Sequence, residues 1–184
     1  MENEIYLATG NMHKLLEIRQ ILGSRVVGYT LPVNENGKTF EANALKKAWA
    51  VMKETGKLAL ADDSGLMVDC LGGSPGVRSA RFASPPTPKN LCGKLLKLMK
   101  GCRNRNARFV CAIAVVYPSG ASRVVKGIVN GKIAERMMGR HGFGYDPVFI
   151  PSGYRETFAE MKPALKNRLS HRGRALRKLK SLLG

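Results

Sequence analysis

The sequence predicts an α/β protein in which a long mixed β-sheet is flanked by helices. In the first third of the chain, short apolar runs alternate with segments whose apolar residues recur every three or four positions, as in alternating strands and helices. In the middle of the chain, two apolar, β-branched runs flank the four residues PSGA, which predicts a hairpin. The 184 residues suffice for one domain with a buried core, so we expect residues 1–184 to form a single domain.

Each expected element has a local signal. Leu15, Ile18 and Leu22 give the first helix one apolar face. Thr39 is a suitable N-cap for the second helix, and Gly56 ends it. The expected order is a strand at 4–8, a helix at 13–22, a strand at 26–31, a helix at about 40–54, a strand at 58–62, a loop at 71–88, a helix at 89–100, strands at 109–117 and 122–134, a loop at 141–151 that ends in a short strand, and a helix at about 164–183.

Composition limits the classes of protein that need to be considered. The longest apolar run, near residues 109–117, is far shorter than the ~20 residues of a membrane span. The N-terminus lacks the pattern of a signal peptide, so we expect a cytoplasmic protein. The four cysteines form no CxxC pair, which argues against a zinc site.

The charge of the chain is strongly positive. There are 31 lysines and arginines against 13 acidic residues, which gives a formal net charge of +18. No acid occurs between Asp69 and Glu135, and none follows Glu160. Such a field favours anionic partners, among them nucleotides and nucleic acid. A basic surface without any specific partner explains the charge equally well.

The first candidate site is the turn between the first strand and the first helix, Thr9-Gly10-Asn11-Met12-His13-Lys14. A glycine lets the backbone approach a ligand, and the N-terminus of a helix presents N–H groups to an anion. Lys14 opposes the helix dipole, which suggests that an anion lies nearby. By itself this pattern is also that of an ordinary strand–turn–helix connection.

The second candidate site is Asp62-Asp63-Ser64-Gly65, at the end of an apolar run. Adjacent strand residues point to opposite faces, so one aspartate can bind a metal ion while the other anchors a loop. Carboxylate oxygens suit Mg²⁺, which commonly bridges to substrate phosphates. Taken alone, the four residues are equally consistent with a solvated turn.

Two further candidate sites lie in the last quarter of the chain. Gly142-Phe143-Gly144-Tyr145-Asp146-Pro147 predicts a tight loop with an aromatic surface on which a nucleobase can stack. In the segment 166–173, Lys166 and Arg172 are candidates for holding phosphate or a base carbonyl, and His171 for donating to a keto oxygen. The alternatives are a loop plugged into the core by Phe143 and a solvated basic helix. The four candidate sites together have the chemistry of a nucleotide site.

The order and wording of these motifs resemble the inosine triphosphate pyrophosphatase family, also described as XTP/dITP pyrophosphatases. The matching runs extend from about residue 6 to residue 178 and are ATGNMHKLLEI, TFEANALKKA, ADDSGLMVDCLGGSPGVRSARF, GFGYDPVFIP, TFAEM and KNRLSHRGRAL. The resemblance implies two lobes with the active-site cleft between them, and a homodimer. It also implies Mg²⁺-dependent hydrolysis of ITP, dITP and XTP to the monophosphate and pyrophosphate.

The resemblance further implies roles for individual residues. Asp63 is the expected catalytic base and a metal ligand, with Glu35 and Asp62 as further metal ligands. The residues expected to bind the substrate are Thr9, Gly10, Asn11, Met12, His13, Lys14, Lys47, Ser64, Phe143, Gly144, Tyr145, Asp146, Lys166, His171 and Arg172. Two alternatives stay open: a basic nucleic-acid-binding protein without turnover, and a pyrophosphatase for other modified nucleotides.

Overall fold

The computed structural model describes residues 4–183 of the chain, which form strands, α-helices and short 3₁₀ helices. The strands are β1 (Ile5–Ala8), β2 (Val26–Tyr29), β3 (Ala59–Val68), β4 (Asn106–Val116), β5 (Ser122–Ile133) and β6 (Phe149–Pro151). The helices are α1 (Met12–Leu22), α2 (Phe40–Thr55), α3 (Pro88–Leu98), α4 (Pro163–Leu169) and α5 (His171–Leu183), with 3₁₀ helices η1 (Asp69–Leu71), η2 (Gly76–Arg81) and η3 (Asp146–Val148).

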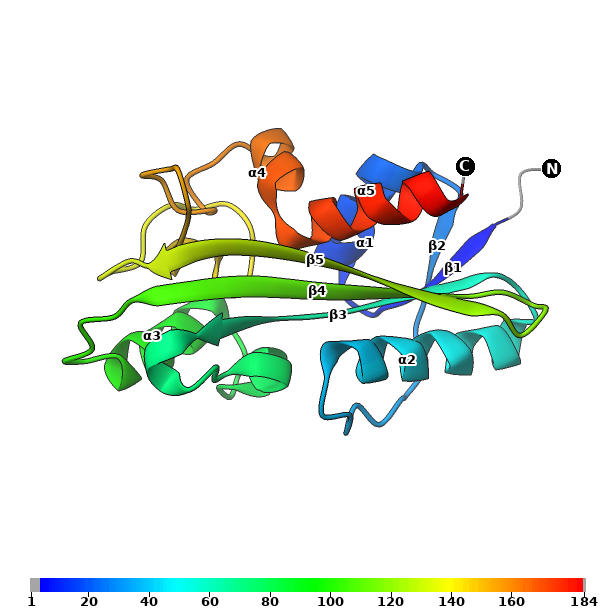
Figure 1. The fold of residues 1–184 in the computed structure, drawn as a ribbon, viewed down its shortest axis with the longest axis horizontal. Helices are drawn as coiled ribbons and strands as arrows, with labels where there is room; N and C mark the ends of the chain where they lie inside the picture. Colours follow the sequence, from blue (N-terminus) through cyan, green and yellow to red (C-terminus); the bar gives the residue numbers. More distant parts are fainter. Residues whose placement is uncertain (1–3, 184) are drawn as a thin grey trace. The chain divides into compact units, whose positions relative to one another are not determined.

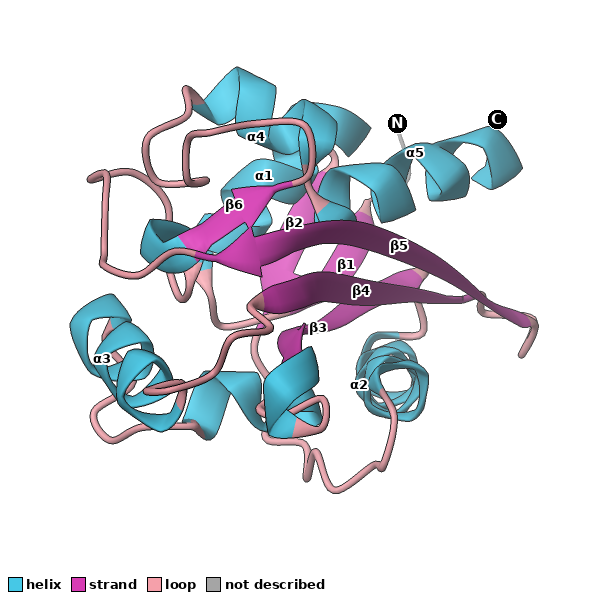
Figure 2. Ribbon diagram, turned by 60° about the vertical axis from the view of Figure 1, so that its left-hand side comes forward, coloured by secondary structure: helices cyan, strands magenta, loops and turns pink. Residues whose placement is uncertain are grey.

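The described strands form one mixed sheet in the order β2-β1-β3-β4-β5-β6. Figure 1 labels the first five strands, and Figure 2 also labels β6. Strand β1 pairs in parallel with both β2 and β3, whereas β5 and β6 pair antiparallel. A turn closed by the hydrogen bond from Tyr117 N to Ala121 O joins β4 to β5, which confirms the predicted hairpin. The α/β class and the mixed sheet with flanking helices are therefore as predicted.

By their internal contacts, the described residues separate into two compact units, which we describe one at a time. The first unit contains residues 4–64, 111–127 and 171–183, and the second contains residues 65–110 and 128–170. Strands β3, β4 and β5 contribute residues to both units. That the whole chain acts as a single domain stays a prediction.

In the first unit, helices cover the sheet on two sides, with α1 and α5 on one and α2 on the other (Figures 1 and 2). Leu15, Ile18 and Leu22 of α1 are buried with Leu176 of α5 in one apolar cluster, as the spacing of the α1 residues predicts. Gly127 of β5 allows α5 to pack closely, because a Cβ atom there would lie 2.1 Å from the His171 carbonyl oxygen.

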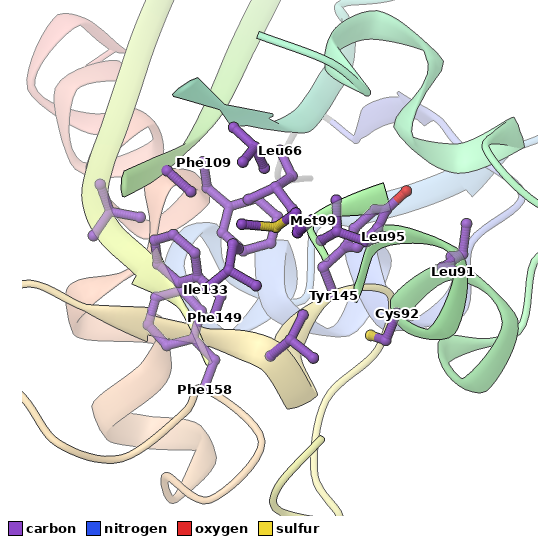
Figure 3. Close-up of a cluster of buried hydrophobic side chains, with 14 of the residues drawn as sticks. Leu66, Leu91, Cys92, Leu95, Met99, Phe109, Ile133, Tyr145, Phe149 and Phe158 are labelled. Atoms are coloured by element: carbon purple, nitrogen blue, oxygen red, sulfur yellow. The ribbon is translucent and has the colours of Figure 1, made fainter. Parts of the chain in front are cut away.

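The core of the second unit packs aromatic rings among a larger number of aliphatic side chains (Figure 3). The centroids of Phe109 and Phe149 lie 4.7 Å apart in an edge-to-face arrangement, which is a favourable geometry for two rings. Helix α3 buries Leu91 and Leu95 in the same cluster and exposes its opposite side. Among residues 4–183, no helix combines the length and the apolar composition that crossing a bilayer requires.

Two expected elements are wrong in their extent. The strand expected to end at Asp62 continues as β3 to Val68, so the two aspartates are buried strand residues and not a solvated turn. The single C-terminal helix is divided into α4 and α5, because Ser170 has extended backbone angles. The loop expected at 71–88 contains the 3₁₀ helix η2.

Candidate functional site

The adjacent aspartates of β3 belong to two different clusters of polar residues in the first unit. Asp62 is 1% exposed and Asp63 is 7% exposed. Successive strand residues point to opposite faces, so each carboxylate has its own neighbours. Asp62 contacts basic side chains of α1 and α5, whereas Asp63 contacts an amide of α2. The sequence-based expectation that the two carboxylates have separate tasks agrees with this arrangement.

Asp62 is the centre of a buried ion cluster. Lys14 Nζ lies 3.0 Å from Asp62 Oδ1, and Arg172 Nη2 lies 3.0 Å from Asp62 Oδ2. Ser64 Oγ donates to Asp62 Oδ2 at 2.8 Å and accepts from Arg172 Nη2 at 3.0 Å. A second acid, Glu17, accepts from Arg172 Nη1 at 2.5 Å. Lys14 and Arg172 therefore compensate the buried charge of Asp62.

The electrostatics of the cluster favour its charged form. Burial alone would raise the pKa of Asp62, but Lys14, followed by Arg172 and Lys47, holds that pKa well below its usual range. Burial would lower the pKa of Arg172, but Asp62 and then Glu17 hold it above its usual value. Both groups are therefore ionised at neutral pH, and each depends on the other for its compensation.

Asp63 is held in place by two hydrogen-bond donors. Asn43 Nδ2 donates to Asp63 Oδ2 at 3.0 Å, and the backbone N–H of Ser64 donates to Asp63 Oδ1 at 3.0 Å. Asn43 is 1% exposed and also accepts from the backbone N–H of Gly37 at 2.8 Å. A Cβ atom on Gly37 would lie 2.5 Å from Asn43 Oδ1, so this approach requires glycine. Asn43 thus connects the loop that precedes α2 to the carboxylate of Asp63.

The same loop places Glu35 beside Lys47. Lys47 Nζ lies 3.0 Å from Glu35 Oε2 and donates to the Asp62 carbonyl oxygen at 2.8 Å. Lys46, the neighbouring residue of α2, donates to Asn36 Oδ1 at 2.6 Å. These contacts place Lys47 of α2 between the Glu35 carboxylate and the backbone of β3, where its charge also acts on Asp63.

The surroundings of Asp63 shift its pKa. Burial raises the pKa of Asp63, and the neighbouring charge of Glu35 adds to this effect. Lys47, the Asn43 amide and Lys14 act in the opposite direction but do not cancel it. A carboxylate whose pKa is raised accepts a proton more readily than an ordinary aspartate, which suits a general base.

The turn between β1 and α1 has a more closed geometry than the sequence suggests. The side-chain oxygen of Asn11 caps α1 by accepting from the N–H groups of His13 and Lys14, at 3.0 and 3.3 Å. Thr9 Oγ1 accepts from Asn11 N at 3.1 Å. A phosphate at this turn would have to share or displace the Asn11 contacts, while the charge of Lys14 is already directed at Asp62.

Gly10 differs from its expected role. Its φ angle lies outside the region that favours glycine, and a Cβ atom would meet Thr30 Oγ1 only at 3.6 Å. The backbone conformation therefore does not require glycine at this position. Gly10 and its neighbours Met12 and His13 are exposed. That Gly10 binds substrate stays a prediction. It is supported by the exposure of Gly10 to solvent and not by an unusual backbone angle.

In the second unit, the loop 142–147 is organised around Asp146. Asp146 Oδ2 accepts from the backbone N–H of Phe143 at 2.7 Å and lies 2.7 Å from Lys166 Nζ. Lys166 Nζ also lies 4.6 Å from the centroid of the Phe143 ring, close enough for a cation–π interaction. At Gly142, with φ +78°, a Cβ atom would lie 2.1 Å from Asp146 Oδ2, so only glycine fits. Phe143, Asp146 and Lys166 thus form one cluster.

Tyr145 is not a surface ring of this loop. It is 4% exposed within the apolar core, and its hydroxyl donates to the Ser79 carbonyl oxygen at 2.9 Å (Figure 3). Burial raises its pKa above the usual range. Tyr145, and not Phe143, is the residue that plugs the loop into the core, which leaves the half-buried Phe143 as the aromatic ring for stacking.

Arg172 and His171 are buried at the start of α5, which is part of the first unit. The guanidinium of Arg172 is already engaged with Asp62 and Glu17, so the structure favours an indirect role for this residue. Direct contact of either residue with substrate stays a prediction.

Two functional candidates, Asn43 and Glu17, have no role assigned in the sequence analysis. Both lie within the runs that resemble the pyrophosphatase family. For each, the position in its helix is a sequence feature that indicates a role. Asn43 is a polar residue on the apolar side of α2, next to Ala44. Glu17 follows Lys14 by three positions, which places both on one side of α1.

The residues around Asp63 are a partial match to a metal site. No group of three or more histidine, cysteine or acidic side chains that could hold a metal ion occurs in the described part of the chain. Mg²⁺ needs no such group, because it is usually held by one or two carboxylates together with substrate phosphates. Asp63 and Glu35 fit this requirement. Both oxygens of Asp62 already contact cations, so its expected role as a ligand stays a prediction.

With Asp63 as the expected metal ligand, Asn43→Ala is expected to lower nucleotide turnover by about 10–100-fold, the usual effect of removing a group that orients such a carboxylate. The variant removes the donor to Asp63 and one link to the Gly37 backbone. Steady-state kinetics with purine nucleoside triphosphates would measure the loss. Asn36→Ala is the matched control, since it removes a contact between the loop and α2 that does not involve Asp63. Equal losses in both variants would contradict a specific role for Asn43.

Comparisons with known proteins find similar sequences and similar solved structures. A sequence model of the Ham1 family matches residues 5–182. A dITP/XTP pyrophosphatase of Bacillus licheniformis is 45% identical over 193 aligned residues, covering 98% of this chain and 97% of the relative. A solved HAM1 protein structure from Coxiella burnetii is 37% identical and covers 98% of both chains, with a TM-score of 0.89. The Ham1 protein structure from Staphylococcus aureus is 36% identical and covers 98% of this chain and 97% of that protein, with a TM-score of 0.88.

Proposed function

The chain belongs to the Ham1 family, and on this premise we propose that it hydrolyses ITP, dITP and XTP to the monophosphate and pyrophosphate. The name dITP/XTP pyrophosphatase, which the Bacillus licheniformis relative bears, supports the substrate class. The observation that carries the proposal is the buried carboxylate of Asp63, which Asn43 and Ser64 N orient beside Lys47 and Glu35. This arrangement has the parts of a site that activates water next to phosphate groups.

The triphosphate is assigned to residues of the first unit. Lys47 provides a half-buried positive charge beside Asp63, and Lys14 provides a second one. Positive side chains hold the phosphates in one orientation and stabilise the charge that develops during the reaction. Thr9 to His13 complete the expected binding turn. Ser64 is assigned to positioning, because its hydroxyl contacts Asp62 and its N–H contacts Asp63.

The purine base is assigned to the cluster of Phe143, Asp146 and Lys166. The Phe143 ring supplies a stacking surface. Lys166, which is 5% exposed, is held by Asp146 and can donate to an acceptor on the base. A donor of this kind favours the 6-keto oxygen of hypoxanthine and xanthine over the 6-amino group of adenine, which would leave the donor unpaired. Gly144 and the backbone of Tyr145 shape the same loop.

Magnesium is the proposed cofactor, with Asp63 and Glu35 as its protein ligands. Bound Mg²⁺ would neutralise phosphate charge and help to orient the reacting groups. The residues of the chain have their own tasks. Asp63 accepts the proton of the attacking water, Asn43 and Ser64 N keep its carboxylate in place, and Lys47 binds a phosphate oxygen. Attack on the α-phosphorus then releases pyrophosphate.

Three properties of the intact protein complete the proposal. We assign the enzyme to the cytoplasm and expect it to form a homodimer. All of residues 1–184 are expected to serve this single activity. Size measurement by light scattering would test the dimer independently of activity.

Product analysis with ITP, ATP and GTP in parallel tests the proposed function. We expect ITP to release pyrophosphate and not orthophosphate, only when Mg²⁺ is present, and at least about a hundredfold faster than ATP. Removal of the metal ion with a chelator should stop the release of pyrophosphate, and added Mg²⁺ should restore that release. Orthophosphate as the first product would contradict the proposed bond cleavage. No turnover of any purine triphosphate would overturn the enzyme assignment.

A further inference from the structure

The exposed side of α3 and the turn that follows it is uniformly basic. Lys89, Lys97 and Lys100 are exposed and recur at spacings of eight and three residues, which keeps them on one side of the helix. Arg103, also exposed, continues this side beyond the helix. We call these four residues the α3 basic face. Helix α3 is labelled in Figures 1 and 2.

The α3 basic face has no acidic partners within the described residues. No acid occurs in the sequence between Asp69 and Glu135. Other cations of the region do have contacts: Lys94 donates to the Phe82 carbonyl oxygen, Arg105 to that of Ile133, and Arg108 pairs with Asp69. By contrast, none of the four cations of the face forms an ion pair in residues 4–183. Their charges are available to a partner.

The lysines of α3, Lys97 of the basic face among them, do not stabilise their own helix. Like charges three or four residues apart on a helix destabilise it by about 0.2–0.5 kcal/mol per pair. Lys94 and Lys97 have this spacing within α3, and no glutamate or aspartate relieves it. The first turn of α3 also lacks the acidic residue that would complement the helix dipole. A partner that brings negative charge would remove this repulsion.

The packing of α3 narrows the choice of partner. Its apolar side is buried in the core through Leu91, Cys92 and Leu95 (Figure 3), so little of it is left to enter a lipid surface. Leu98 is the one large apolar side chain of α3 that is markedly exposed. A second copy of the chain is a poor match, because it has only 13 acids against 31 basic residues. A regular polyanion, with charges that repeat along its length, is a better match.

We propose that the α3 basic face docks the phosphate backbone of nucleic acid. This binding is separate from nucleotide hydrolysis, because none of the four residues belongs to the proposed site. It is not sequence-specific, since the four side chains present cations and no planar amide or aromatic group that would distinguish base edges. Four cations on the backbone of a DNA duplex would give a slope of about −3.6 in log affinity against log salt concentration.

A double-stranded DNA probe of 20 base pairs tests the inference by fluorescence anisotropy, with the full-length protein. Between 50 and 200 mM KCl, we expect the affinity to fall by at least about a hundredfold. The variant Lys89→Gln, Lys97→Gln, Lys100→Gln, Arg103→Gln should bind at least about tenfold more weakly at 100 mM KCl. For this variant, the slope of log affinity against log salt concentration should be smaller in magnitude by about 3. Hydrolysis of ITP by this variant should stay at the rate of the unmodified protein, whatever that rate is.

The matched control removes the same number of positive charges elsewhere. Arg25, Lys53, Lys57 and Arg155 are exposed, lie outside the α3 basic face and have no place in the proposed site. Their combined replacement by glutamine should change DNA affinity by less than about threefold. Equal losses in both variants would show that net charge alone attracts DNA and would overturn the inference. The inference would also be overturned if the α3 variant bound DNA as tightly as the unmodified protein. Tighter binding of the α3 basic face to phosphatidylserine vesicles than to DNA would overturn it as well.

Discussion

Asp63→Asn is expected to lower the rate of ITP hydrolysis by about 10²–10⁴-fold, the usual contribution of a general base. The asparagine side chain has nearly the same shape but cannot accept the proton of the attacking water. It can still accept one of the two hydrogen bonds that Asp63 accepts from Asn43 and Ser64 N. Release of pyrophosphate at saturating ITP and Mg²⁺ measures the loss directly.

The control for this variant is Asp69→Asn, which makes the same chemical change a few residues further along the chain. Asp69 lies just beyond β3, is half-exposed and pairs with Arg108. Its replacement should leave turnover within about twofold. The melting temperature of Asp63→Asn should change by no more than about 2–4 °C, which corresponds to about 1 kcal/mol in a chain of this size. A properly folded Asp63→Asn enzyme that keeps a tenth of the activity would exclude Asp63 as the base.

Asp62→Asn is expected to lower the free energy of unfolding by about 3–5 kcal/mol at pH 7. Removal of one member of a buried ion pair leaves its partner charged and uncompensated. Asp62 contacts both Lys14 and Arg172, and Arg172 is 2% exposed. Glu17 still compensates part of the Arg172 charge, so we expect a loss at the lower end of this range. Urea unfolding followed by circular dichroism gives the free energy.

The exposed ion pair between Asp69 and Arg108 again supplies the comparison. Both side chains are about 40% exposed, at 39% and 41%. Such pairs contribute about 0–1 kcal/mol. Asp69→Asn should therefore change the free energy of unfolding by less than about 1 kcal/mol. If Asp62→Asn and Asp69→Asn lower the free energy of unfolding by the same amount, burial does not strengthen the Asp62 cluster. Our assignment of this cluster as a structural centre would then be wrong.

The pH dependence of stability follows from the same cluster. The pKa of Asp62 is lower in the folded protein than its ordinary value of 3.8. A carboxylate whose pKa is lowered in the folded state contributes its full stabilisation at any pH above its unfolded-state pKa. This contribution is lost as the pH falls from the unfolded-state pKa toward the folded-state pKa. Stability of the unmodified protein should therefore decline below about pH 4, and Asp62→Asn should show a weaker decline over the same range.

The sequence by itself determined the fold class, the family motifs and most of the residues of the proposed site. The periodicity of Leu15, Ile18 and Leu22 was sufficient for α1, because one side of a helix must be apolar in order to pack. Asp62 and Asp63 could be selected because charged residues at the end of an apolar run are rarely buried without a partner. Lys166 could be selected from a basic cluster, whereas Lys47 was indicated only by the family resemblance. These properties are local in the chain.

Only the tertiary structure decided which charges face one another. Asp62 and Arg172 are 110 positions apart, and no local pattern predicts that they share a hydrogen bond. The same holds for Asn43 and Asp63, which meet because α2 packs beside β3 in the first unit. The burial of Tyr145 likewise depends on a distant neighbour, because its hydroxyl donates to the Ser79 carbonyl oxygen, 66 positions away. Side chains acquire their roles from electrostatic and packing contacts, and these contacts exist only after the chain has folded.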